Sequence, residues 1–282
     1  MKDWLTVRRG EAPLILSLPH TGTEIPAEYE KNFVSPWLAR RDTDWWVDQL
    51  YDFAAAEFDA TIVRTSISRS IIDVNRDPSG VSLYPGQATT ELCPTTTFDG
   101  DPLYKENCAP DSADVAERRT RYFDPYHAAV AHELIRLRAL HPAVVLYDCH
   151  SIRSVVPRLF KGVLPEFNVG TNGGKSCATE LSQRIVEICA ESGRSHVLNG
   201  RFKGGWITRH HAAPSKGVHA VQMEIACRAY MREPSEALSD RNWPARFDAA
   251  HAAPLRGALR RVLSACRDFA ASAASGLLPD QP

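Results

Sequence analysis

Four short polar motifs, far apart in the chain, each follow or interrupt an apolar run of strand type. They are Pro19-His20-Thr21-Gly22, Ser68-Arg69 with residues 73–76, Asp148-Cys149-His150-Ser151, and Gln222-Met223-Glu224-Ile225. Each contains a side chain that can bind a metal, bind an anion or move a proton. A hydrophobic core needs none of these groups, and burying one without a partner costs several kcal/mol. The pattern therefore predicts a fold that brings the ends of several strands to one site.

The order of strand and helix patterns predicts the fold class. Strands are expected at residues 13–18, 61–63, 70–74, 144–147 and 218–226. Helices are expected at 37–58, 114–140, 177–188 and 246–273, the last interrupted by Pro254. This alternation predicts an α/β fold with a mixed or mostly parallel sheet flanked by helices, in a single domain over 1–282. The segment 76–110, rich in Pro, Gly and Thr, is too long for a simple connection and indicates a functional loop.

Composition and charge restrict the class of protein. The 282 residues are 44% hydrophobic and 24% charged, as in ordinary globular proteins. The net charge of −1 offers no basic surplus for nucleic acid. No apolar run reaches the ~18 residues of a membrane span, and the N-terminus has no apolar signal core. We expect a cytoplasmic protein that binds neither nucleic acid nor membrane; its oligomeric state stays open.

The seven cysteines are odd in number and include no CxxC pair, so free buried thiols are expected. Cys149 stands beside His150 and could suggest a nucleophile. Adjacent side chains of a strand point to opposite faces, however. If His150 faces a site, Cys149 faces the core.

Two histidines at the ends of predicted strands, His20 and His150, suggest a metal centre. Ligands of open α/β sheets bind at the carboxyl ends of strands. Two histidines and one carboxylate are a usual ligand set of catalytic zinc, with the fourth position left for water. The carboxylate is either Asp44 or Glu24. The segment 42–44 could instead cap a helix, and Glu24 could be a solvated turn residue.

A second group, formed by Arg69, Asn75 and Arg76, indicates anion binding. Arginine forks bind carboxylates through two hydrogen bonds, and an asparagine adds a directional amide. This density of donors suggests a small substrate with two carboxylates. The alternative is that Asp73 and Asp77 simply pair with the arginines.

Glu224 interrupts an otherwise apolar strand, where a carboxylate is rarely buried without a task. A raised pKa and a role in proton transfer are expected, and a structural ion pair is the alternative.

The segment 204–211 begins with two glycines and continues with cation-capable side chains. It suggests a mobile substrate loop in which Arg209 is a further anion clamp and Trp206 closes the site. Adjacent residues rarely aim at one ion, so at most one of His210 and His211 is expected to reach the site.

The segments SLPHTG, DTDWWVDQLYDFA, SRSIIDVNR, TTFDGDPLY, DCHS, FKGGWITRHH and GVHAVQMEI resemble the N-formylglutamate amidohydrolases, relatives of the zinc carboxypeptidases and aspartoacylases. The resemblance extends from about Pro13 to Tyr230. It implies a three-layer α/β fold of the zinc-carboxypeptidase (phosphorylase/hydrolase-like) type. It also implies one zinc ion and hydrolysis of N-formyl-L-glutamate to formate and glutamate, a step of histidine breakdown.

The resemblance also implies roles for single residues. It makes zinc ligands of His20 and His150, and of Asp44 through its DTDW segment. It makes Glu224 the catalytic acid–base and Arg69 the oxyanion-binding group. Substrate carboxylates are then held by Asn75, Arg76 and Arg209, with Trp206 over the site. Thr23 stands where carboxypeptidases and aspartoacylases have the glutamate of HxxE, so Asp44 is favoured over Glu24.

Two other functions are compatible with these residues. One is a related amidase that acts on another N-acyl amino acid. The other is a non-catalytic carboxylate-binding protein on the same scaffold, although binding alone would not need Glu224 as a base.

Overall fold

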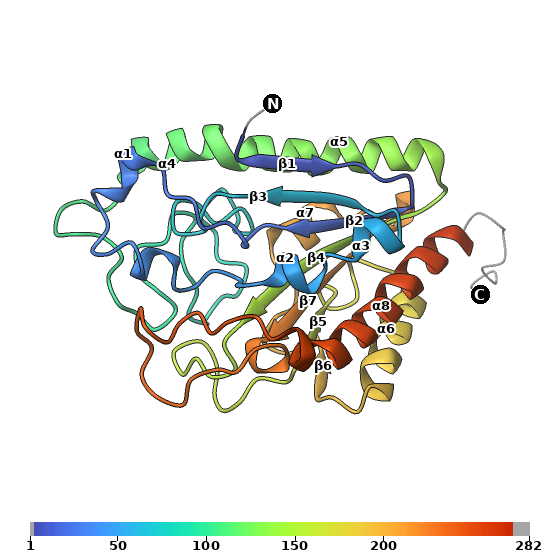
Figure 1. Ribbon diagram of the computed structural model, residues 1–282. Coiled ribbons are helices and arrows are strands. Elements are labelled where there is room, and N and C mark those ends of the chain that lie inside the picture. Colours follow the sequence, from blue (N-terminus) through green and yellow to red (C-terminus); the bar gives the residue numbers. More distant parts are fainter. Residues whose placement is uncertain (1–2, 273–282) are drawn as a thin grey trace.

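The computed structural model describes residues 3–272 and contains a seven-stranded sheet (Figure 1). The strand order is β1-β3-β2-β4-β7-β5-β6. The strands are β1 (Leu5–Arg8), β2 (Leu14–Leu18), β3 (Thr61–Thr65), β4 (Val144–Ile152), β5 (Phe167–Gly170), β6 (His196–Leu198) and β7 (Val218–Ala226). β1 runs antiparallel to β3 and β5 antiparallel to β7, whereas the other neighbouring pairs are parallel. The predicted α/β fold with a mixed, mostly parallel sheet is confirmed.

Helices cover both faces of the sheet (Figure 1). They are α1 (Ala27–Glu30), α2 (Val47–Leu50), α3 (Ala54–Glu57), α4 (Ser112–Arg118), α5 (Asp124–Leu140), α6 (Thr179–Glu191), α7 (Trp206–His211) and α8 (Ala249–Ser272). Short 3₁₀ turns lie at Leu38–Arg40, Pro214–Lys216 and Cys227–Ala229, and a π-helical turn at Arg119–Phe123 joins α4 to α5. α5 packs on one face, and α6 and α8 pack together on the other. Among residues 3–272, no helix is long and apolar enough to cross a membrane.

The strand pattern explains the two-sided core. In β2, Leu14, Leu16 and Leu18 join the cluster beneath α8, whereas Ile15 joins the cluster beneath α5. β4 lies at the centre of the sheet, and all nine of its residues are buried. Polar side chains on β4 are therefore removed from bulk water by the sheet itself.

The predicted continuous helix over 37–58 is wrong. The chain forms a 3₁₀ turn, α2 and α3 instead, and Trp46 adopts a left-handed conformation with φ 64° at the start of α2. The break follows from Asp44, whose backbone N–H donates to the His20 carbonyl (3.0 Å) and whose carboxylate is buried. Asp44 is therefore not a helix cap.

The predicted strand over 70–74 is also wrong. Neither edge of β3 is free to accept another strand, because β1 pairs with one edge and β2 with the other. The segment is a buried turn, and its Ile71, Ile72 and Val74 pack into the core beneath α5. Its apolar pattern reflects burial in the core without sheet pairing.

The other helix predictions are close. The segment 114–140 is helical from Ser112, and its capping box uses Asp111 with Asp114. α8 continues through Pro254, so the predicted interruption is wrong. The predicted end at residue 273 lies outside the described residues. All seven cysteines are free, and Cys149 is buried in the core as predicted.

Candidate metal centre and active site

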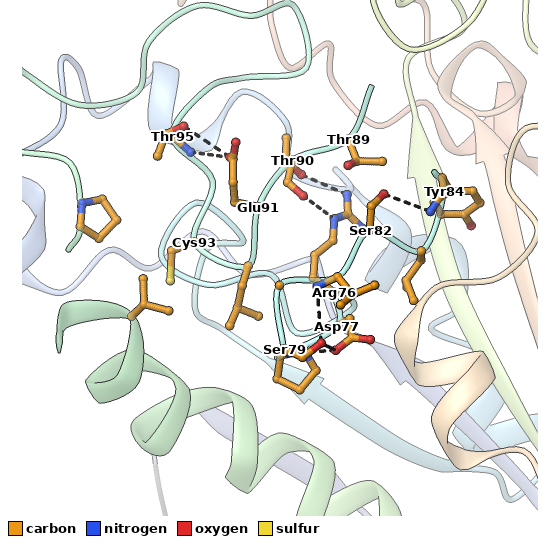
Figure 2. Close-up of a pocket in the computed structure, with 17 residues that line it drawn as sticks. Arg76, Asp77, Ser79, Ser82, Tyr84, Thr89, Thr90, Glu91, Cys93 and Thr95 are labelled. Atoms are coloured by element: carbon orange, nitrogen blue, oxygen red, sulfur yellow. Dashed lines mark hydrogen bonds between the residues drawn. The ribbon is translucent and has the colours of Figure 1, made fainter. Parts of the chain in front are cut away.

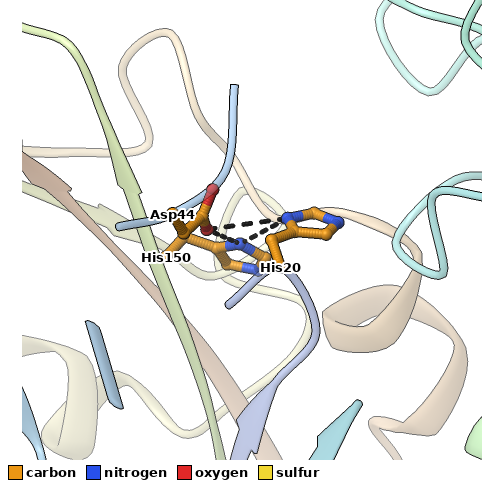
Figure 3. Close-up of side chains that lie close together, drawn as sticks. All are labelled: His20, Asp44 and His150. Carbon is orange, nitrogen blue, oxygen red and sulfur yellow. Dashed lines mark hydrogen bonds and ion pairs between the residues drawn. The ribbon is translucent and has the colours of Figure 1, made fainter. Parts of the chain in front are cut away.

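Three side chains from distant parts of the chain converge at one end of the sheet (Figure 3). His20 follows β2, His150 lies in the neighbouring β4, and Asp44 comes from the loop before α2. The two histidine Nδ1 atoms are 3.1 Å apart. The Oδ2 atom of Asp44 lies 3.1 Å from the Nδ1 of His150 and 3.6 Å from that of His20. The three residues are only 2%, 1% and 3% exposed for His20, Asp44 and His150.

The other nitrogen of each ring faces a second carboxylate. The Nε2 of His20 is 2.7 Å from Asp73 Oδ1, and the Nε2 of His150 is 2.9 Å from Asp148 Oδ2. A carboxylate beside Nε2 selects the tautomer with the proton on that nitrogen, as in metal sites of proteins. Both Nδ1 lone pairs then point at one another and at Asp44. This donor set suits a bound cation, and two nitrogens with one oxygen fit zinc.

The charges around His20, Asp44 and His150 also stabilise a positive charge at this site. Asp44 and Asp73 are buried, which by itself would raise the pKa of a carboxyl group. Neighbouring histidines and arginines nevertheless hold both pKa values below the ordinary range. Burial lowers the pKa of His150, but Asp148 and Asp44 outweigh it and raise that pKa well above the ordinary value. The site therefore attracts a proton or another cation.

Local backbone contacts bring His20 to this position. A Cβ on Gly22 would lie 2.4–2.5 Å from backbone atoms of Ser66 and Ile67, so only glycine allows this close approach. Glu24, the alternative carboxylate, is exposed and accepts a hydrogen bond from Ser66 Oγ (2.7 Å). By geometry Asp44, rather than Glu24, accompanies the two histidines.

Glu224 lies on β7 directly opposite His150 in the parallel register with β4. Both residues line a small cavity of about 50 Å³. Gln222 Nε2 donates to the Glu224 carboxylate (3.2 Å). Burial raises the pKa of Glu224 to about 7. A carboxylate with this pKa beside a cavity is suited to both accept and release a proton.

Arg69 lines the same cavity. Its Nη1 donates to Asp44 Oδ1 (3.1 Å) and its Nη2 to Asp73 Oδ2 (2.7 Å). The Phe98 ring lies 4.8 Å from its guanidinium carbon. Each Nη nitrogen carries a second N–H, so Arg69 retains donors for a ligand.

Asn75 connects the site to α7. The backbone N–H of Ile207 donates to Asn75 Oδ1 (2.8 Å), which fixes the orientation of the amide. The Nδ2 atom then donates to Asp148 Oδ2 (3.3 Å) and lies 2.9 Å from His150 Nε2. A Cβ on Gly205 would come within 2.4 Å of this amide, so glycine is required where α7 begins.

Arg76 separates two cavities. It lines the small cavity beside Glu224 and a larger one of about 450 Å³ formed by residues 76–95 with Pro110 and Val115 (Figure 2). Its guanidinium donates to the carbonyl and hydroxyl oxygens of Thr90 at 3.1 and 3.0 Å. Its Nη2 also lies 3.5 Å from Asp73 Oδ2. Arg76 therefore links the loop at 90 to the carboxylates around His20.

Four residues of the glycine-rich segment lie outside the small cavity. Trp206 stacks on His210 with ring centroids 4.8 Å apart, and His211 Nε2 is 2.9 Å from His127 Nδ1. Arg209 donates to the Gly204 carbonyl (2.9 Å). Neither His210 nor His211 lines the cavity, in agreement with the expectation that at most one would reach it. The roles predicted for Arg209 and Trp206 in substrate binding stay predictions.

Sequence reasoning missed the carboxylates that hold the histidine rings. The sequence interpretation makes Asp73 only a partner for arginines, and it gives no role to Asp148. The signal for Asp148 was present, because residues two apart on a strand share a face and Asp148 precedes His150 by two. Arg201, which also lines the cavity, carried no signal because it lies in an irregular segment.

The fold and the site define a class of protein, an α/β protein with a buried histidine–aspartate group that could hold a metal ion beside a small cavity. The sequence profile of the N-formylglutamate amidohydrolase family matches residues 12–231. The chain belongs to this family.

Individual relatives agree with this assignment. The chain is 48% identical over 238 residues to an N-formylglutamate deformylase of Pseudomonas aeruginosa and 46% identical to one of Pseudomonas putida. Each match covers 83% of this chain and 87% of the relative. The crystal structure of an N-formylglutamate amidohydrolase from Ralstonia eutropha JMP134 has the same fold, with a TM-score of 0.74 and 24% identity. That match covers 97% of this chain and 99% of the other.

Proposed function

We propose that the protein hydrolyses N-formyl-L-glutamate to formate and L-glutamate with one divalent ion, zinc, as a step of histidine breakdown in the cytoplasm. The observation that carries this proposal is the convergence of His20, Asp44 and His150 beside Glu224 in a cavity with arginines. The names of the Pseudomonas relatives support the choice of substrate.

The chain provides three ligand atoms for the ion. These are the Nδ1 atoms of His20 and His150 and the Oδ2 atom of Asp44. When bound, the ion supplies a Lewis acid for the formyl oxygen and lowers the pKa of water towards ~7. Asp73 and Asp148 keep the two imidazole rings in the orientation that directs Nδ1 at the ion.

Glu224 carries out the proton transfers. Its carboxylate takes a proton from the attacking water as the water oxygen bonds to the formyl carbon. The same proton then goes to the amide nitrogen as the C–N bond breaks, which releases formate and the amino group of glutamate. Arg69 provides N–H donors next to His20, Asp44 and His150, which we call the ligand group. It stabilises the oxyanion of the tetrahedral intermediate.

The substrate carboxylates require cations and amide donors on the cavity wall. Arg76 and Asn75 both line the cavity and are proposed to take part. The sequence also predicts Arg209 and Trp206 as substrate contacts, but neither lines the cavity, so we assign the carboxylates to residues that do. Two carboxylates on the substrate explain why several arginines gather around one small cavity.

The test is release of formate from N-formyl-L-glutamate by purified protein, before and after chelation and after readdition of zinc. We expect about one zinc per chain, loss of activity with the metal, and recovery on readdition. His150→Ala should lose both metal and activity, and full metal content with full activity in this variant would contradict the ligand assignment. Faster turnover of another N-acyl amino acid would support the related amidase instead.

A further inference from the structure

Arg201 lines the active-site cavity and has no role in the mechanism above. It lies in the segment between β6 and α7 and is half-buried. Its Nε donates to the Leu159 carbonyl and its Nη2 to the Ala88 carbonyl, both at 2.8 Å. The guanidinium is thus fixed by backbone oxygens of two separate loops. Nη1 has no such partner among the described residues.

The charge of Arg201 is not neutralised by the protein. Arg69 pairs with Asp44 and Asp73, and Arg76 lies 3.5 Å from Asp73. Within residues 3–272, Arg201 forms no ion pair with a carboxylate. Burial is the largest cause that lowers the pKa of Arg201; Tyr84 and Glu224 raise this pKa and Arg76 lowers it, and the net shift is downward. A half-buried guanidinium without an ion-pair partner on a cavity wall can bind an anion.

The surroundings of Arg201 place it away from the ligand group. Arg69 and Arg76 both approach Asp73, which itself contacts His20. Within residues 3–272, the hydrogen bonds of Arg201 go to loop carbonyls, and its ring contacts are with Tyr84 and Phe202. An anion on Arg201 would therefore bind at a part of the cavity wall that makes no hydrogen bond or ion pair with His20, Asp44 or His150.

We propose that Arg201 binds the substrate carboxylate remote from the scissile amide, and so sets the preference for an acidic side chain. This inference takes its substrate class from the proposed function. Arg76, which lies closer to the ligand group, then binds the substrate carboxylate next to the amide. Arg201 is then a specificity-determining residue that acts in substrate binding.

Arg209 provides a matched control. The guanidinium carbons of Arg201 and Arg209 lie 5.2 and 5.1 Å from the ring centroid of Tyr84. Either substitution removes one cation–π contact with this loop residue. Only Arg201 lines the cavity, however. Loosening of the loop should follow from both substitutions, whereas loss of carboxylate binding should follow from Arg201 alone.

The experiment compares kcat/KM for N-formyl-L-glutamate and for N-formyl-L-glutamine, its neutral isostere. Arg201→Met should lower kcat/KM for the acid by roughly 10–150-fold, mainly through KM, the range of a lost charge-assisted hydrogen bond. The amide substrate should lose less than about 3-fold. Arg201→Lys should recover part of the preference, since it keeps the charge without the planar fork. Arg209→Met should change both substrates alike and leave their ratio intact.

Equal losses on both substrates in Arg201→Met would show that Arg201 only ties the loops together, and would overturn the inference. So would collapse of the ratio in Arg209→Met. Binding of glutarate against pentanoate, measured by calorimetry, separates this inference from the proposed function. If the wild type does not release formate but Arg201→Met reduces glutarate affinity to that of pentanoate, the carboxylate site stands without the function. Unchanged glutarate affinity in that variant overturns the site.

Discussion

At the scale of single residues, the active site depends on carboxylates that do not touch the reacting atoms. Asp73 and Asp148 each hold one imidazole ring through Nε2. They fix the tautomer and rotation of rings that would otherwise have two equivalent ways to bind. Such partners of metal ligands are worth about 10–100-fold in metal affinity.

Asp73→Asn should therefore weaken zinc binding by roughly 10–100-fold, because the amide is a poorer acceptor for the His20 N–H. Asp77→Asn is the control, since Asp77 lies four residues away and, among residues 3–272, its side chain bonds Ser79 alone. Competition with a zinc-sensitive dye measures both affinities. Similar affinities in the two variants would show that Asp73 serves only the arginines.

Glu224→Gln should retain the fold and the metal and lose activity by on the order of 10²–10⁴-fold, as for loss of a general base. The amide is isosteric and can still bond Gln222, so packing is preserved. Single-turnover formate release and metal content are measured on the same sample. Near-wild-type turnover would place the base elsewhere.

The sequence predicts these site residues unevenly. His20, His150 and Glu224 are recognisable because each interrupts or ends an apolar strand. The residue pattern alone did not separate Asp44 from Glu24, because the left-handed turn at Trp46 close to Asp44 has no sequence signature; only the family resemblance favoured Asp44. A left-handed tryptophan is imposed by tertiary contacts and opposes local preference.

At the scale of elements, the short helix α7 positions the site through its first turn. Its backbone N–H groups hold both the carbonyl and the side chain of Asn75. Gly205 lets α7 approach this closely, and the Gly205 N–H itself donates to Gln222 Oε1 (2.7 Å). Helix α7 thus connects strands β4 and β7 close to His150 and Glu224.

Gly205→Ala should destabilise the protein by roughly 1–3 kcal/mol and lower activity, because the new Cβ collides with the Asn75 amide. Gly257→Ala is the matched control, since Gly257 is exposed within α8 and a Cβ there meets nothing. It should raise stability by about 0.5–1 kcal/mol. Urea denaturation measures both changes. If Gly205→Ala costs as much stability in an Asn75→Ala background as in the wild type, the collision is not the cause.

Helices and strands were predicted correctly where the local sequence pattern determines them. β4, β7, α5 and α6 combine strong periodicity with clear ends, and all were found. The segments 37–58 and 70–74 were not, because their apolar residues reach the core from turns and short helices whose course depends on the site. Residues 70–74 could have formed a strand only beside a free edge of β3. Both edges of β3 are paired, and a single sequence does not reveal this.

At the scale of the whole molecule, a histidine pair, the buried His127 and the half-buried His211, joins α5 to α7 and makes stability depend on pH. Burial lowers the pKa of His127 to about 4 and that of His211 to about 3, each from the ordinary histidine value of 6.5. His127 Nε2 lies 2.8 Å from the Val74 carbonyl, which leads directly into Asn75. Both rings are neutral in the native protein.

Because both folded-state pKa values are depressed, the unfolded chain binds more protons below pH 6.5. The stabilisation is complete above about pH 6.5 and is lost as the pH falls towards about 4 and then 3. His211→Gln should reduce the slope of unfolding free energy against pH in this window by up to about 1.4 kcal/mol per unit. Urea titrations from about pH 7.5 to 4.5 test this, and carboxylates that titrate in both proteins cancel. Parallel curves would show that His211 takes up its proton in the folded state.

The burial of the three proposed ligands, His20, Asp44 and His150, has a consequence for how quickly a bound ion would exchange. A chelator cannot bind an ion whose ligands are at most 3% exposed. Release of the ion therefore requires local opening of the surrounding segments. The rate of zinc loss should therefore reach a plateau as chelator concentration rises, at the opening rate of the protein. A rate that keeps rising in proportion to chelator would mean direct access. With a plateau, the residence time of the ion is set by protein motion, and brief exposure to a strong chelator leaves the enzyme active.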